Sequence, residues 1–166
     1  MITQKSMYNL FKQISEKHTF IKSFGYGEVE DIEPFIGVNK LYPLMWVSLN
    51  QTTIANGLVF REYNIIVGDL LLNGRENYID ILDQTESICI DIFSIINQSS
   101  QNTFEVSSQP ILTPFTERFS ETLAGHTLNI TIQTDAGLPD VGNCEIQLDG
   151  SIEYDPMNGT DENKTK

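Results

Sequence analysis

The stretch that decides the fold is residues 75–96, RENYIDILDQTESICIDIFSII. Its core-forming residues recur at steps of three and four, the spacing that places side chains on one face of a helix. The residues on this face are Tyr78, Ile81, Leu82, Thr85, Ile88, Cys89, Ile92, Ile95 and Ile96. Isoleucine is only a middling helix former, so the helix needs packing to hold it. We therefore expect a long helix lying across one face of a sheet.

The clearest strand of that sheet is residues 127–134, TLNITIQT. Its apolar residues Leu128, Ile130 and Ile132 alternate with polar ones, so the two sets point to opposite faces of a strand. One polar face and one apolar face are typical of a half-buried strand in an antiparallel sheet.

Two more strands are predicted before the long helix, at residues 41–49 and 58–72. Between them, the polar residues 50–57 are expected to form a loop. The alternation in the second segment slips between Phe60 and Tyr63, which predicts a β-bulge there.

A shorter helix is predicted at the N-terminal end. Its apolar stripe consists of Met7, Leu10, Phe11 and Ile14, with His18 at the helix end. Gly25 and Gly27 are expected to break the helix with a turn, and Pro34 to block a restart.

The remaining segments complete an α+β fold. Residues 103–108 and 111–119 are predicted strands, and residues 144–148 a short final one. The order helix, two strands, helix, strands predicts a two-layer α+β domain, with the helices packed on a mainly antiparallel sheet. We place this single domain at residues 1–150, and the polar, acidic residues 151–166 form a C-terminal tail.

The charge of the chain excludes some classes of function. With 23 acidic and 10 basic side chains, the net charge is −13. Such a chain would be repelled by nucleic-acid phosphates and by an anionic membrane surface. A negative charge of this size is consistent with three roles: it keeps the protein soluble, it forms a binding surface for a basic partner, or it lines a channel through which DNA passes without binding. No signal peptide or membrane span is recognised, so we expect synthesis in the cytoplasm.

The chain lacks a recognisable catalytic or metal-binding motif. The histidines His18 and His126 and the cysteines Cys89 and Cys144 do not have the short spacings of a zinc site. The cysteines fit buried thiols, although a bridge between them stays open. We expect no enzyme activity, no cofactor and no metal. Trp46 and Tyr63 could be core residues or interface anchors.

One further stretch, residues 110–134, has a distinctive sequence: PILTPFTERFSETLAGHTLNITIQT. Together with the element order, it resembles tail-terminator and head-to-tail joining proteins of tailed bacteriophages, in particular relatives from phages of Bacteroidetes. The resemblance covers roughly residues 5–148 and includes a cysteine, Cys144, near a short final strand.

This resemblance implies a structural virion protein of the phage neck or tail, assembled in the host cytoplasm. Copies of the chain would form a closed ring and contact other neck, portal or tail proteins, and DNA would pass through without specific binding. We expect the contacts at residues 50–57 and 115–125. The candidate interface residues are Thr52, Thr53, Phe115, Arg118 and Phe119.

Two other classes of function remain open. The first is an acidic adaptor or chaperone-like module that binds one partner without catalysis. The second is a small enzyme with a pocket under the long helix, which would need convergent polar groups in an apolar cleft.

Overall fold

In a computed structural model, the chain is described at residues 2–36, 40–99, 104–106, 109–118 and 122–136. The helices are α1 (Gln4–Lys17), α2 (Ile32–Ile36) and α3 (Tyr78–Ser99), with 3-10 turns at Val29–Asp31 and Asn73–Arg75. The strands are β1 (Ser23–Tyr26), β2 (Leu44–Ala55), β3 (Leu58–Leu70), β4 (Glu105–Val106), β5 (Ile111–Arg118) and β6 (Leu123–Asp135).

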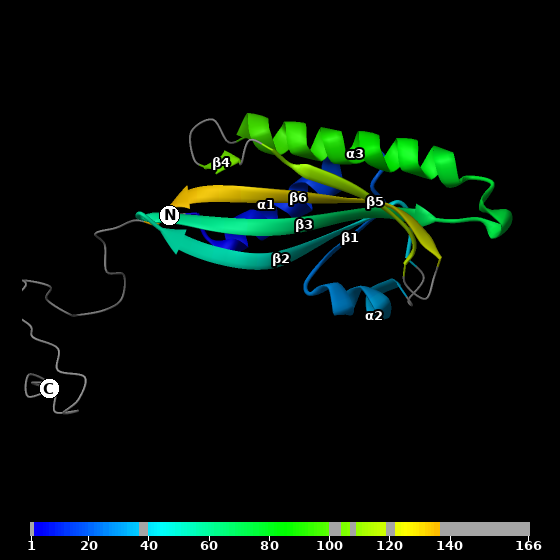
Figure 1. Ribbon diagram of the computed structural model, residues 1–166, viewed down its shortest axis with the longest axis horizontal. Coiled ribbons are helices and arrows are strands. Elements are labelled where there is room, and N and C mark those ends of the chain that lie inside the picture. The colour runs from blue at the N-terminus through cyan, green and yellow to red at the C-terminus, as the bar shows by residue number, and fades with distance from the viewer. Residues whose placement is uncertain (1, 37–39, 100–103, 107–108, 119–121, 137–166) are drawn as a thin grey trace, which may run out of the picture.

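The strands form one mixed sheet in the order β1-β2-β3-β6-β4, and β5 also pairs with β6. β1 runs parallel to β2, and the other pairs are antiparallel. The long helix α3 lies across the sheet (Figure 1). The predicted α+β class, with a long and a shorter helix on a mainly antiparallel sheet, is confirmed.

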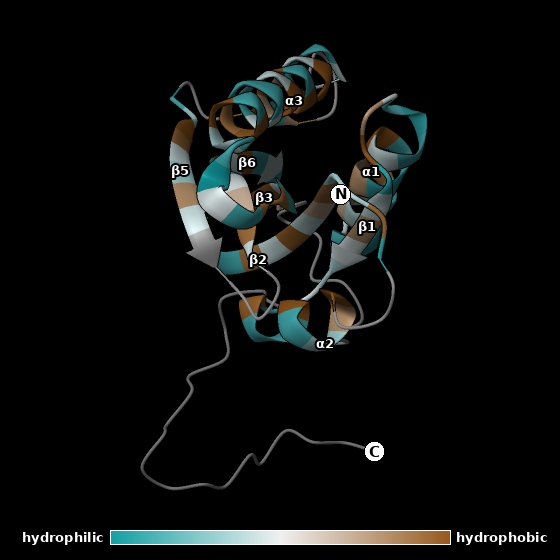
Figure 2. Cartoon of the chain, turned by 90° about the vertical axis from the view of Figure 1, so that its right-hand side faces the viewer, coloured by the Kyte–Doolittle hydropathy of each residue, from teal (hydrophilic) through white to brown (hydrophobic). Residues whose placement is uncertain are grey.

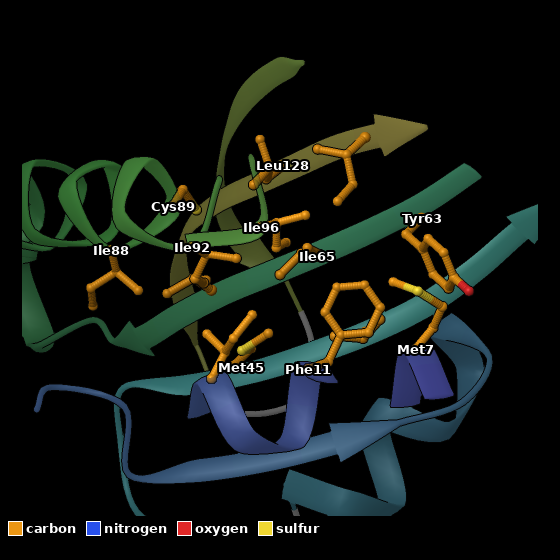
Figure 3. Packing of buried hydrophobic residues seen from close by; sticks show 14 of the residues in the cluster. Met7, Phe11, Met45, Tyr63, Ile65, Ile88, Cys89, Ile92, Ile96 and Leu128 are labelled. Carbon is orange, nitrogen blue, oxygen red and sulfur yellow. The ribbon is translucent and has the colours of Figure 1, made fainter. Parts of the chain in front are cut away.

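The main core lies between the sheet and the two helices α1 and α3. Met7 and Phe11 of α1, Ile88 and Ile92 of α3 and the strand residue Ile65 belong to one cluster of buried side chains, which Figure 3 shows between the helices and the strands. All five are at most 1% exposed. Burying aliphatic and aromatic side chains of this size contributes about 1.5–3 kcal/mol each, so this layer accounts for much of the stability.

A second, smaller core lies on the other face of the sheet, under α2. Its buried residues are Ile32, Ile36, Leu44, Trp46, Ile66 and Leu123. Figure 2 shows α2 and α3 on opposite sides of the strands. The short helix was not predicted, because Pro34 was expected to block a helix there. A proline is tolerated in the first turn of a helix, where its missing N–H is not needed, and Pro34 is the third residue of α2.

The predicted turn at Gly25 and Gly27 is wrong in part, because residues 23–26 form β1. Gly25 pairs with Trp46, and a Cβ atom at position 25 would collide with the Trp46 ring. The glycine therefore lets an indole pack directly on the strand backbone. The helix before it ends as predicted, with His18 as the C-cap of α1 and Thr3 as its N-cap.

The predicted loop at residues 50–57 is also wrong. β2 continues to Ala55, and only Asn56 and Gly57 form the turn into β3. Both have positive φ (53° and 76°), as a tight two-residue hairpin requires. The irregularity in pairing lies in β2, at Asn50, rather than in β3.

From Leu58 to Ile65, fully buried residues alternate with partly buried ones in β3, because Arg61 takes an inward-facing position. Val59, Arg61, Tyr63, Ile65 and Val67 are all buried. Because a charged residue is expected to face solvent, the inward-facing charge gave the false appearance of a shift in the alternation of apolar and polar residues along β3. Trp46 and Tyr63 are 3% and 0% exposed, which makes both core residues within this chain.

α3 has the face that the spacing predicted. Its buried residues are Ile81, Thr85, Ile88, Cys89, Ile92 and Ile96. Ile95 is the exception, at 39% exposed, because it borders a groove rather than the sheet. Within the described ranges, no helix is both long and apolar enough to cross a membrane.

Two of the later strands compare with the predicted ones as follows. β4, at Glu105–Val106, lies inside the predicted residues 103–108, of which 103, 107 and 108 are outside the described residues. β6 begins at Leu123, four residues before the predicted start. Leu128, Ile130 and Ile132 are buried as predicted. The predicted strand at residues 144–148, with Cys144, and the predicted tail at residues 151–166 lie outside the described residues.

Candidate functional site

The most distinctive surface is the outer half of the β2–β3 hairpin, which we call the hairpin arm (residues 50–60). Residues 50–55 of β2 are exposed on both faces of the strand. Figure 1 shows this end of the sheet extending past the end of α3. Ile54 is 70% exposed there. In the first half of β2, the residues on the same face of the sheet are covered by helices.

The arm has an unpaired outer edge. β1 pairs with β2 only from Leu44 to Val47. Beyond Val47, none of the described strands lies on that side of β2, so the backbone groups between Ser48 and Ala55 that point outward have no strand partner there. Such an edge is a template for pairing with another chain. Thr52 and Thr53, predicted as contact residues, lie on this edge strand and are exposed.

A polar cluster on the arm's base ties three strands together. The Glu62 carboxylate of β3 accepts hydrogen bonds from Asn50 and Gln51 of β2, at 3.2 and 2.8 Å, and from Asn129 of β6, at 2.9 Å. These bonds, chiefly that from Asn129, hold the pKa of Glu62 below its usual value, although burial opposes them. The side-chain bonds fix the arm's direction relative to the sheet.

The second predicted contact region lies at the other end of the sheet. Phe115 of β5 pairs with Gly125, which in turn pairs with Gly68. Thr53 pairs with Phe60, eight positions away from Gly68 along β3, or about 26 Å at roughly 3.3 Å per residue. The structure therefore does not bring the two predicted regions together.

Of the three predicted residues of this second region, the structure describes the side chain of Phe115 alone. Phe115 is half-buried and packs against the core under α2. Arg118 is the last residue of β5 and pairs with Leu123. Its side chain, and all of Phe119, lie outside the described residues.

A groove between α1 and α3 has a volume of about 520 Å³. Phe20 and Ile95 line it and are 51% and 39% exposed. At its wall, Nε2 of His18 lies 3.3 Å from the Asp91 carboxylate. Ser94 also lines the groove, but its hydroxyl donates to the carbonyl of Ile90 within its own helix. The hydroxyl is therefore not set up as a nucleophile.

The second histidine, His126, is buried under α3. Its Nδ1 lies 2.9 Å from the hydroxyl of Thr85. Burial lowers the pKa of His126, and the nearby charge of Glu86 opposes the shift. His126 is thus a satisfied core histidine. Among the residues that the structure describes, no group of three His, Cys, Asp or Glu side chains could hold a metal ion.

Cys89 is a buried free thiol. Burial in the apolar core, with a smaller contribution from Glu86, raises the pKa of Cys89 to about 12. A thiol in this state is a poor nucleophile. The other cysteine, Cys144, lies outside the described residues.

Comparison with known proteins gives no family assignment: no family model matches this sequence, and no curated protein matches it.

Two features of the β2–β3 hairpin were missed in the sequence. The Asn56-Gly57 pair between two strand-like segments is a strong signal for a tight hairpin, and it could have predicted the full length of β2. The inward position of Arg61 had no such signal, because a charged residue is expected to face solvent.

Proposed function

We propose that this protein is a structural subunit that works by binding other chains, forming a ring in the neck or tail of a tailed bacteriophage. The observation that carries the proposal is the hairpin arm, with its unpaired edge and its exposure on both faces. A monomer that works alone has no use for a long open edge, which risks unwanted pairing.

The separation of the two predicted contact regions supports a ring. A closed ring needs a different surface on each side of the subunit, so that one side of a copy meets the other side of its neighbour. The arm with Thr53 and the region around Phe115 lie at opposite ends of the sheet. They could therefore serve as the two sides.

The charge supports the same proposal. A net charge of −13 would let DNA pass through a ring without adhering to its wall, since attraction to phosphates would slow its passage. This role requires no catalysis, because the subunit acts through the shape and the contacts of the assembled ring.

A second candidate is an adaptor that binds one partner without closing a ring. The groove between α1 and α3 favours it, because it exposes the apolar side chains of Phe20 and Ile95. Stoichiometry separates the two candidates: an adaptor forms complexes of fixed small size, whereas a ring subunit forms one discrete, closed assembly.

The test is the mass of the full chain in solution by light scattering, followed by negative-stain imaging. Thr52→Lys with Thr53→Lys puts charge on the open edge and should prevent assembly. Ser87→Lys adds a charge at an exposed position of α3 and serves as the matched control. Rings from the wild type and the control, but not from the edge variant, would support the proposal.

If the purified chain stays monomeric, it is mixed with purified tail tubes or portal rings of tailed phages. Binding that the edge variant loses would support the proposal, because some subunits close only on their template. A monomer that binds neither would contradict it.

A further inference from the structure

A pocket of about 340 Å³ lies on the face of the sheet where α2 packs. Its apolar walls include Val29, in the turn before α2, and Phe115 of β5. Polar residues of three adjacent strands also line it, namely Asn64, Thr113 and Thr127. Apolar walls with a few polar groups are the usual composition of a binding pocket.

The hydroxyl of Thr127 is a polar group that calls for a partner in this pocket. Thr127 pairs with Ile66 on one side and with Thr113 on the other, so the three side chains stand on the same face of the sheet. The hydroxyl oxygen of Thr127 is buried and has no hydrogen-bond partner among the described residues. A buried hydroxyl without a partner is unfavourable, so an occupant that brings a hydrogen-bonding group is stabilised there.

The pocket and the hairpin arm share a lack of charge. None of the described residues that line the pocket is charged. Residues 41–60, which include the whole arm, contain no charged side chain. Because the net charge of the chain is −13, two copies repel each other and approach best where both surfaces are uncharged.

The tip of the arm carries side chains that suit the pocket. Ile54 is 70% exposed and matches the apolar walls. Asn56, in the turn of the hairpin, is also exposed, and its amide both donates and accepts hydrogen bonds. The amide therefore matches the hydroxyl of Thr127.

The tip of the arm does not reach the pocket of its own chain. Ile54 pairs with Val59, and the pocket residue Ile66 lies seven positions farther along β3, about 23 Å at roughly 3.3 Å per residue. Pairing of β3 with β6 over the full length of β3 holds the two places apart. A tip that enters the pocket must therefore come from another copy.

We propose that the pocket between Val29, Phe115 and Thr127 receives the tip of the hairpin arm, residues 53–57, from a second copy of the chain. Ile54 packs against the apolar walls, and the amide of Asn56 forms a hydrogen bond with the hydroxyl of Thr127. This contact rests on the proposed function, since it joins two different surfaces of neighbouring ring subunits.

Disulfide trapping in the full chain tests the contact. The test variant combines Ile54→Cys on the tip with Thr113→Cys at the exposed side of the pocket. Cys144→Ser removes one native thiol, and Cys89 is buried. The controls are Ile54→Cys alone and Ile54→Cys with Ser87→Cys, an exposed position of α3. The oxidised proteins are compared on a denaturing gel without reductant.

The expected result is a ladder of covalent oligomers that ends at one discrete size, in the test variant and in neither control. Covalent dimers that extend no further, and that the controls lack, would keep the contact but overturn the ring. No crosslinking beyond the controls would overturn the contact, and rings seen by negative-stain imaging would then leave the proposed function standing.

A further substitution tests the hydrogen bond. Thr127→Val keeps the shape of the side chain and removes its hydroxyl, so in the test variant it should slow crosslinking about two- to tenfold, the range for one hydrogen bond. An unchanged rate would overturn the role of Thr127.

Discussion

The hydroxyl oxygen of Thr85 lies 2.9 Å from Nδ1 of His126 and joins α3 to β6 inside the core. The same hydroxyl donates to the carbonyl of Ile81 over 2.7 Å, so it must accept its hydrogen bond from the histidine. The neutral ring of His126 therefore carries its proton on Nδ1. A single hydroxyl thus sets both the helix position and the tautomer of a buried histidine.

Replacing Thr85 by valine should destabilise the protein by about 1–3 kcal/mol, because the shape is kept while the Nδ1–H of His126 is left buried without an acceptor. Urea unfolding, followed by circular dichroism, measures the change. Thr85→Ser keeps the hydroxyl and should lose less stability. Equal stability of Thr85→Val and the wild type would mean that the bond contributes nothing.

The stability of the protein should fall as the pH drops below about 6.5, because burial lowers the pKa of His126 in the folded chain. A group with a lowered pKa contributes its full stability above the unfolded pKa. That contribution is lost as the pH falls, at no more than about 1.4 kcal/mol per pH unit.

The measurement is the unfolding free energy between pH 7.5 and 5 for the wild type and for His126→Asn, which keeps a donor near Thr85 but does not titrate. The difference between the two curves isolates His126 from acids such as Asp69, whose pKa is raised by burial. Parallel curves would show that His126 has the same pKa in the folded and in the unfolded chain, which contradicts the prediction.

Gly25→Ala should destabilise the protein by about 1–3 kcal/mol, the usual range for an added methyl group in a filled core. The new Cβ would collide with the Trp46 ring. Trp46 is the chain's one tryptophan, so its emission reports the displacement as well as unfolding.

The same substitution in a Trp46→Phe background provides the control. The smaller ring leaves room for the new methyl group, so the loss caused by Gly25→Ala should shrink. An equal loss in both backgrounds would place the strain in the backbone of β1 rather than in the contact with the ring.

The sequence could predict those elements whose side-chain period matches the local geometry. The stripe from Ile81 to Ile96 repeats with the turn of a helix, and Leu128, Ile130 and Ile132 repeat with the pleat of a strand. Each pattern requires one buried face, so it predicted both the element and the layer that it belongs to. The α+β class follows from these two patterns together.

The tertiary structure alone decided the elements whose form depends on distant partners. Gly25 lies in a strand because Trp46 packs on it, and α2 forms because the far face of the sheet needs a cover. Arg61 faces inward because the strand's alternation, set by Tyr63 and Ile65, outweighs the cost of burying one charge. The outer half of β2 extends beyond the helices and is exposed. No local sequence pattern predicts this exposure, because it depends on where the other elements end.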